Sequence, residues 1–123
     1  GIKKWHDRTR EKILAKRPFV DNVFGYRRYL FDRPDLPDAL AWQPQSVVGR
    51  AINEAWVRIY NQAPYIQVLI QVHDSLVGQF PTRLKQRALE DLRKLAPTTI
   101  PYSDPLVIPV GIKTSEESWG TCV

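Results

Sequence analysis

The sequence predicts an α+β fold in which helices pack against an antiparallel sheet. Residues 43–62 place apolar side chains at helical spacing, whereas residues 65–80 contain two runs of branched apolar residues that favour strands. The predicted elements follow in the order helix, strand pair, helix, hairpin, helix and strand, which is typical of this class. No internal repeat or low-complexity tract divides the chain. We therefore expect residues 1–123 to form a single unit.

The N-terminal part is predicted to contain a surface helix and a short hairpin. Apolar residues recur at helical spacing from residue 2 onward, and the helix should end before Pro18. Residues 19–31 are rich in aromatic residues and valine, which favours a strand or short hairpin carrying Arg27 and Arg28. Residues 32–38 alternate proline with aspartate, so we expect a surface loop there.

The strongest helical pattern spans residues 43–62. Pro44 fits the first turn of this helix and Pro64 closes it. After the predicted hairpin, Thr82 can cap a third helix that runs to about Leu95.

The C-terminal part is predicted to hold one strand. Pro97 and Pro101 interrupt regular structure after the third helix, and residues 106–113 favour a strand. Pro109 would place that strand at a sheet edge or a bulge. Residues 114–123 show no clear period.

Positive charge is concentrated at one end of the sequence. Residues 1–31 contain nine basic and three acidic side chains, whereas the whole chain has a net charge of +5. The remaining residues are therefore close to neutral. A concentrated basic segment suits a polyanion such as nucleic acid, and the alternative is a solvated helix face.

Cysteine and hydropathy exclude some classes of protein. The single Cys122 allows neither an intrachain disulfide nor a zinc cluster built from cysteines. No apolar run is long enough to span a bilayer, so we expect a soluble intracellular protein that does not enter a membrane.

The predicted hairpin places a carboxylate at its tip. His73, Asp74 and Ser75 interrupt the two apolar runs, which indicates a very tight turn. The ordinary explanation for Asp74 is turn chemistry, and adjacent residues cannot form a hydrolase triad. A Mg²⁺ site is the more plausible functional alternative, because Mg²⁺ takes few protein carboxylates. Two-metal catalysis would need a second carboxylate, which no residue near Asp74 supplies.

The predicted hairpin and four segments around it, in the same order, resemble family A DNA polymerases over nearly the whole chain. The segment QVHDSLVGQFP resembles motif C of that family, in which His-Asp-Glu separates two strands. Its neighbours along the chain also match: GIKKWHDRTREKI is similar to the helix that follows the fingers, and FGYRRYL to a Gly-Arg-Arg-containing segment. WQPQSVVGRAINEAWVRIY resembles a helix whose glutamine lies against the DNA minor groove, and PLVIPVGIKTSEESWG the last strand and terminal Trp segment.

The resemblance implies the C-terminal palm portion of a DNA-directed DNA polymerase. Asp74 would be a ligand of two catalytic Mg²⁺ ions, and His73 would lie beside the primer terminus. Gln45 would contact the minor groove at the primer–template junction. Arg28, with its neighbour Arg27, would contact DNA there too.

Departures from the family pattern limit this expectation. Ser75 stands where the family has Glu, Ala41 where an Asn is common, and the stretch between Tyr29 and Gln45 is short for the family. The chain also lacks motif A, with the other metal-binding Asp, and the fingers helix that holds the incoming nucleotide. The resemblance therefore implies activity only with a larger polymerase chain that supplies both, together with primer–template DNA and a dNTP.

Three interpretations remain open at the level of sequence. The first is the small chain of a split phage-type polymerase, acting in the cytoplasm of a bacterial cell or phage-infected host. The second is a non-catalytic DNA-binding subunit derived from a polymerase. The third is an unrelated basic α+β binding module in which the hairpin is structural.

Overall fold

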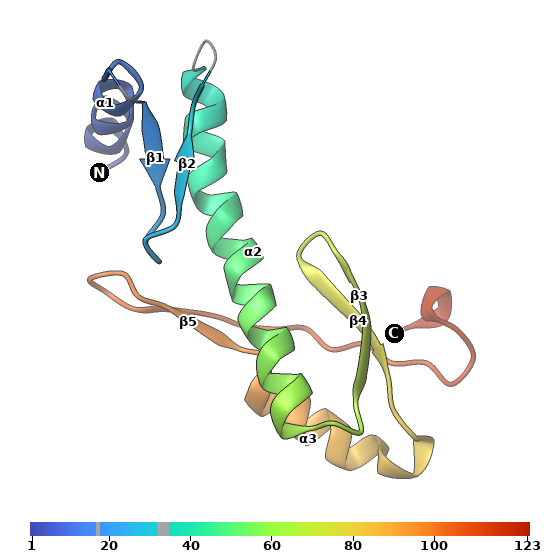
Figure 1. Ribbon diagram of the computed structural model, residues 1–123. Coiled ribbons are helices and arrows are strands. Elements are labelled where there is room, and N and C mark those ends of the chain that lie inside the picture. Colours follow the sequence, from blue (N-terminus) through green and yellow to red (C-terminus); the bar gives the residue numbers. More distant parts are fainter. Residues whose placement is uncertain (17, 32–34) are drawn as a thin grey trace. The chain divides into compact units, whose positions relative to one another are not determined.

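The computed structural model describes residues 1–16, 18–31 and 35–123, and it confirms the α+β class (Figure 1). The backbone groups into two compact units, residues 1–48 and 49–123. The single unit expected from the sequence stays a prediction. The elements are α1 (Ile2–Ile13), β1 (Phe19–Asp21), β2 (Arg27–Tyr29), α2 (Leu36–Gln62), β3 (Gln67–Val72), β4 (Ser75–Gln79), η1 (Thr82–Leu84), α3 (Lys85–Leu95), β5 (Thr98–Ile100), β6 (Leu106–Ile108) and η2 (Trp119–Thr121).

The first unit is built from α1, the β1–β2 hairpin and the start of α2. The strands pair antiparallel, with Phe19 opposite Tyr29 and Asp21 opposite Arg27, as the predicted strand pair requires. Ile13, Val20 and Ala39 form its small buried core. One apolar residue from each element thus holds the helices against the hairpin.

Side-chain hydrogen bonds supplement this small core. Trp5 Nε1 donates to Gln43 Oε1 at 2.7 Å, and Gln43 Nε2 donates to Thr9 Oγ1 at 3.2 Å. Lys12 and Asp21 form an ion pair between α1 and β1. Gln43 therefore ties α2 to α1, a role that its sequence position did not indicate.

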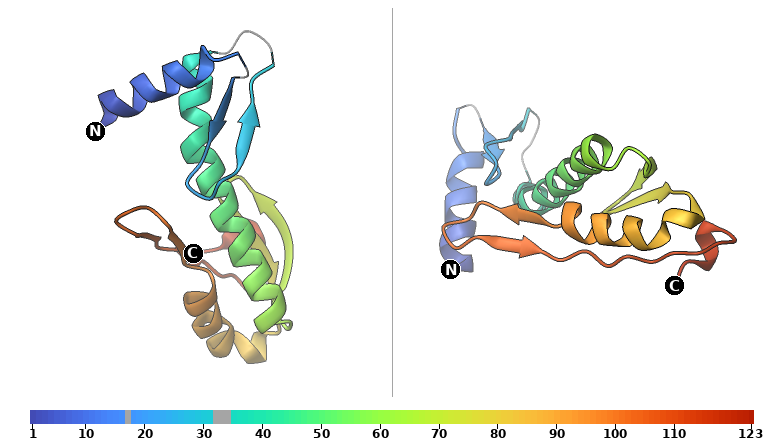
Figure 2. Two further views of the ribbon diagram at one scale, coloured as in Figure 1. Left: turned by 60° about the vertical axis from the view of Figure 1, so that its left-hand side comes forward. Right: turned by 90° about the horizontal axis from the view of Figure 1, so that it is seen from below.

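The second unit packs the end of α2, the β3–β4 hairpin and α3 around one core (Figures 1 and 2). Its buried members come from α2, α3 and the segments that adjoin them, and Val68, Leu76 and Phe80 of the hairpin region pack against them. Tyr65 Oη, just before β3, donates to Asp91 Oδ2 of α3 at 2.6 Å. Burial and this hydrogen bond raise the pKa of Tyr65 above its ordinary value.

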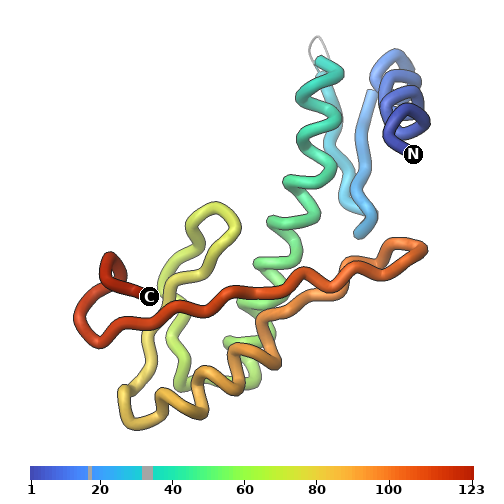
Figure 3. Tube along the Cα trace, turned by 180° about the vertical axis from the view of Figure 1, so that it is seen from behind, coloured from blue at the N-terminus to red at the C-terminus, as the bar shows by residue number. Residues whose placement is uncertain are grey.

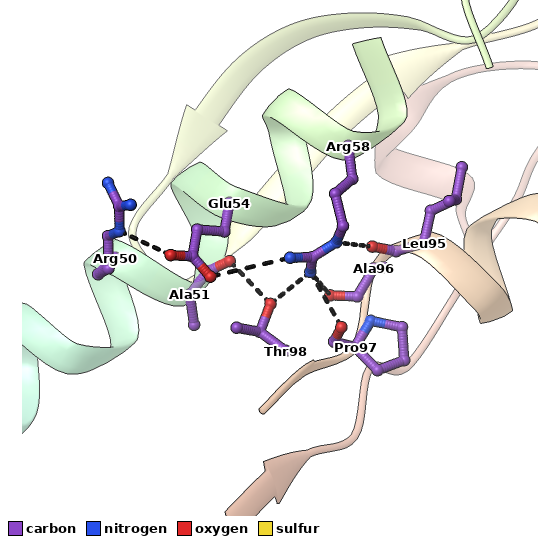
Figure 4. A network of polar contacts seen from close by, with 8 residues as sticks. All are labelled: Arg50, Ala51, Glu54, Arg58, Leu95, Ala96, Pro97 and Thr98. Carbon is purple, nitrogen blue, oxygen red and sulfur yellow. Dashed lines mark hydrogen bonds and ion pairs between the residues drawn. The ribbon is translucent and has the colours of Figure 1, made fainter. Parts of the chain in front are cut away.

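Arg58 of α2 holds the end of α3 (Figure 4). Its Nε donates to Leu95 O at 2.7 Å, and its Nη2 donates to Ala96 O at 3.3 Å and to Pro97 O at 2.9 Å. The last carbonyl groups of a helix have no partners within the helix. The guanidinium group supplies donors in their place and also favours the negative end of the helix dipole.

The start of α2 differs from the sequence prediction. The helix begins at Leu36 instead of residue 43, so Pro44 lies in its interior. Of the loop expected over 32–38, residues 32–34 lie outside the described residues and 36–38 are helical. An interior proline costs roughly 3 kcal/mol, and we attribute its tolerance to the burial of Ala39 against Ile13 and Val20.

The strands form three separate two-stranded sheets instead of one sheet, at least within the described residues. β5 lies between two prolines where no strand was predicted, and it pairs with β6. β6 ends at Ile108, so Pro109 follows the strand and does not interrupt it. Figure 3 shows this hairpin and the segment that follows it.

The predicted cap of the third helix is also wrong. Thr82 begins the short 3-10 turn η1, and no side-chain hydrogen bond caps either η1 or α3. Leu84 N donates to Pro81 O at 2.8 Å instead. The predicted end at Leu95 is confirmed.

Within the part of the chain that the structure describes, every helix is too short or too polar to cross a membrane.

Candidate functional site

The β3–β4 hairpin has a two-residue turn at its tip, as the sequence predicts. Val72 pairs with Ser75, which leaves only His73 and Asp74 to reverse the chain. His73 has a φ of 52°, in the left-handed region that tight hairpin turns require and that glycine or asparagine usually occupies. The geometry of this turn therefore holds a histidine and a carboxylate at the end of the hairpin.

Other side chains stabilise the turn. Ser75 Oγ donates to Val72 O at 2.8 Å, and Gln71 Nε2 donates to His73 O at 3.2 Å. The turn is thus closed by the residues that flank it.

The carboxylate of Asp74 takes no part in these contacts. Asp74 is exposed, and within residues 1–16, 18–31 and 35–123 its side chain has neither a hydrogen bond nor an ion pair. An aspartate kept for turn chemistry ordinarily accepts a hydrogen bond from the backbone nearby. Both oxygens of Asp74 are instead available to a cation or a ligand.

Asp74 alone does not make a metal site. The described residues contain no group of three or more His, Cys, Asp or Glu side chains that could hold a metal ion. Mg²⁺ is commonly bound through one or two carboxylates, with water and substrate phosphates completing its shell. Asp74 can therefore serve as one ligand of a site whose remaining ligands come from elsewhere.

Three of the four residues predicted to contact DNA, Gln45, Arg27 and Arg28, lie in the first unit, and the fourth, His73, lies in the second. Gln45 is exposed on α2, one residue after Pro44. Arg27 and Arg28 are exposed neighbours on β2, and the Cζ atom of Arg27 lies 4.1 Å from the ring centroid of Phe19. Asp74, the predicted metal ligand, also belongs to the second unit.

The structure also contains a pocket that the sequence did not reveal. It has a volume of about 330 Å³ and is lined by the β3–β4 hairpin, Lys85 and the C-terminal segment, including Lys113 and Trp119. Two of its lining residues form an ion pair, with Lys85 Nζ 3.1 Å from Glu116 Oε1. His73 and Asp74 are not among its lining residues, so the pocket is separate from the hairpin tip.

Comparison with known proteins finds a weak sequence similarity to a DNA polymerase. No protein-family model and no solved structure matches the chain. The sequence is 26% identical, over 125 residues, to the thermostable DNA polymerase I of Thermus filiformis. The alignment covers 90% of this chain but only 14% of that protein. The chain is thus weakly similar to a small part of a DNA polymerase I.

Proposed function

We propose that this chain is the C-terminal palm portion of a family A DNA polymerase, with Asp74 as one carboxylate of a two-metal site. The observation that carries the proposal is the free carboxylate of Asp74 at the two-residue tip of the hairpin. The weak similarity to DNA polymerase I supports the same class of enzyme.

The position of Asp74 suits a metal ligand. A short carboxylate on a tight turn between paired strands is held in one direction, so little conformational freedom is lost when it binds a cation. The turn itself is closed by Ser75 and Gln71, which leaves the carboxylate uncommitted. We propose that His73, the other residue of this turn, contacts the primer terminus.

The proposed reaction is nucleotidyl transfer from a dNTP to the 3′ hydroxyl of a primer. The oxygen of this hydroxyl attacks the α-phosphate, the bond to the bridging oxygen breaks, and pyrophosphate leaves. Two Mg²⁺ ions would stabilise charge on the attacking and leaving oxygens. The role of Asp74 is to hold those ions, and Gln45, Arg27 and Arg28 would contact the primer–template DNA.

This reaction needs a larger partner chain. Among the described residues no group of three or more His, Cys, Asp or Glu side chains could hold a metal ion, and we propose that a second carboxylate comes from outside them. We propose that the partner supplies motif A and the fingers, as in a split phage-type polymerase in the cytoplasm of a bacterial cell or phage-infected host. The isolated chain should therefore not extend a primer.

Primer extension by the assembled complex tests the proposal. The chain is purified with its partner and assayed with primer–template DNA, dNTPs and Mg²⁺. Replacing Asp74 with Asn removes the charge but keeps a residue that favours turns, and we expect kcat to fall roughly 100-fold or more.

Asp104 provides a matched control for this substitution. It is another exposed aspartate, in the turn between β5 and β6. Asp104→Asn should leave kcat unchanged. A near-normal rate for Asp74→Asn would show that Asp74 is not a metal ligand.

Ser75 favours a second candidate, a non-catalytic DNA-binding subunit derived from a polymerase. Serine has no carboxylate, so this position offers no second acid beside Asp74, and its hydroxyl group donates to Val72 O instead. A subunit of this kind would bind DNA in a salt-dependent manner and give no primer extension with any partner. Activity in the assembled complex would exclude it.

A further inference from the structure

One face of the β1–β2 hairpin carries a row of aromatic side chains. Phe19 and Tyr29 are opposite each other, with ring centroids 6.1 Å apart. Phe31 continues the row, 6.1 Å from Tyr29 with ring planes inclined by 26°. We call Phe19, Tyr29 and Phe31, with Arg27, the aromatic platform.

The platform is not part of the core of the first unit. Side chains alternate between the two faces of a strand, and Val20 and Leu30 belong to the side that packs in the core. Tyr29 is 48% exposed and Phe31 is 90% exposed. An exposed cluster of large aromatic rings is unfavourable in water and commonly marks a binding surface.

Cations accompany these rings. The Cζ atom of Arg27 lies 4.1 Å from the ring centroid of Phe19, and Lys12 Nζ lies 5.6 Å from the same centroid. Asp21 lies opposite Arg27 on this face and pairs with Lys12, whereas Arg28 lies opposite Val20 and therefore belongs to the other face. The rings thus lie beside two cations and one carboxylate, in a segment, residues 1–31, that carries nine basic and three acidic side chains.

We propose that the aromatic platform binds single-stranded nucleic acid by stacking unpaired bases on its rings. Every base has a π face, so exposed aromatic rings accept bases of any sequence, and nearby Arg and Lys side chains contact the phosphates. Arg27 can also stack through its planar guanidinium group. The bases of a duplex are already stacked and paired, so the ligand is a single strand.

This site is separate from the proposed catalytic residue. The platform lies in the first unit, and its chemistry involves neither Asp74 nor a metal ion. Binding of a single strand can therefore be measured without Mg²⁺ and without a partner chain. Failure of primer extension would leave this proposal standing.

Binding of labelled ten-nucleotide strands to the full chain tests the platform. Fluorescence anisotropy gives the Kd for oligothymidylate, for oligouridylate and for an abasic DNA strand with the same phosphates. Phe31→Leu and Tyr29→Leu keep an apolar side chain but remove the flat ring. Each should raise the Kd for strands with bases roughly tenfold, because each ring contributes the stacking of about one base.

Tyr60→Leu is the matched control. Tyr60 is 71% exposed on α2 but lies outside the platform, and its replacement should change the Kd less than twofold. The abasic strand should bind more weakly than oligothymidylate and should not respond to Phe31→Leu. Circular dichroism verifies that each variant is folded.

Each possible result of the binding assay either supports the aromatic platform or overturns it. Tighter binding of oligothymidylate than oligouridylate, or the reverse, identifies the kind of strand, and either supports the platform. No binding of either strand overturns it. An unchanged Kd in the double variant of Tyr29 and Phe31, or an equal loss for the abasic strand, would also overturn it.

Discussion

The two hairpins that carry the predicted site residues differ in where their functional groups lie. The β3–β4 hairpin turns in two residues and presents Asp74 at its tip. The β1–β2 hairpin turns through residues 22–26 and presents aromatic and cationic side chains on one face. The β3–β4 hairpin thus offers one carboxylate at its tip, and the β1–β2 hairpin offers a face of aromatic and cationic side chains.

The turns explain this difference. In the β1–β2 turn, Asn22 Oδ1 accepts hydrogen bonds from Phe24 N and Tyr26 N, and Asn22 Nδ2 donates to Ser46 Oγ. The polar side chain at this turn is fully engaged in holding it. In the β3–β4 turn the flanking residues Gln71 and Ser75 make the hydrogen bonds to the backbone, so the carboxylate of Asp74 remains available to a ligand. A polar residue in a turn is therefore a better candidate ligand when neighbouring side chains make the hydrogen bonds to the backbone of the turn.

Gly78→Ala should disrupt the β3–β4 hairpin and have the largest effect on stability. A Cβ atom at Gly78 would lie 2.8 Å from Gln67 O, a backbone atom of the paired strand, so the strands would have to shift. We expect the free energy of unfolding to fall by about 2 kcal/mol, measured by urea denaturation. Gly49→Ala is the control, because a Cβ atom there meets nothing within 4 Å, and it should stabilise helix α2 by roughly 0.5–1 kcal/mol. Equal effects of the two substitutions would contradict the close approach at Gly78.

Asn22→Ala should have an intermediate effect, through the β1–β2 turn. The substitution removes the acceptor of two backbone N–H groups and the donor to Ser46. We expect a loss of about 1.5 kcal/mol in the free energy of unfolding. Asn61→Ala, at an exposed position near the end of α2, is the control and should stay within about 0.5 kcal/mol of the parent. If Asn22→Ala also changed so little, the turn would not depend on this side chain.

His73→Gly should have the smallest effect and the opposite sign. Glycine adopts the φ of 52° at position 73 without strain, but it also loses more chain entropy on folding. We expect a net gain of roughly 0.5 kcal/mol in the free energy of unfolding, because the relief of strain exceeds the entropy cost of glycine. If the assembled complex loses primer extension while stability rises, the strained histidine is retained for function. A loss of stability would show that contacts of the imidazole outweigh the strain.

The sequence predicted some local features of the hairpins and helices, but neither the start of α2 nor the absence of a side-chain cap on the third helix. Strand alternation, helical spacing and turn residues act over a few positions, so the tight turn at His73 and Asp74 and the end of α3 at Leu95 were accessible. The hydrogen bonds and ring contacts of individual side chains could not be predicted from the sequence. Sequence gave no sign that Ser75 rather than Asp74 bonds to the turn, or that Arg27 lies over Phe19.

Two departures from the prediction share one physical cause. α2 begins at Leu36 in spite of Pro44, and Ala39 is buried there with Ile13 and Val20. β5 forms between two prolines where Arg58, 40 residues away in the sequence, donates to Thr98, and β6 supplies its pairing partner. Contacts between distant residues outweighed local preference in both places.

The sequence by itself therefore determined the class of fold, the concentration of positive charge in residues 1–31 and the carboxylate at the hairpin tip. These follow from composition, periodicity and turn chemistry, which are local. Only the tertiary structure decided where α2 begins, that the strands form separate pairs, and that Phe19, Tyr29 and Phe31 line up beside Arg27. Those features depend on free energies of burial and pairing between residues that are far apart along the chain.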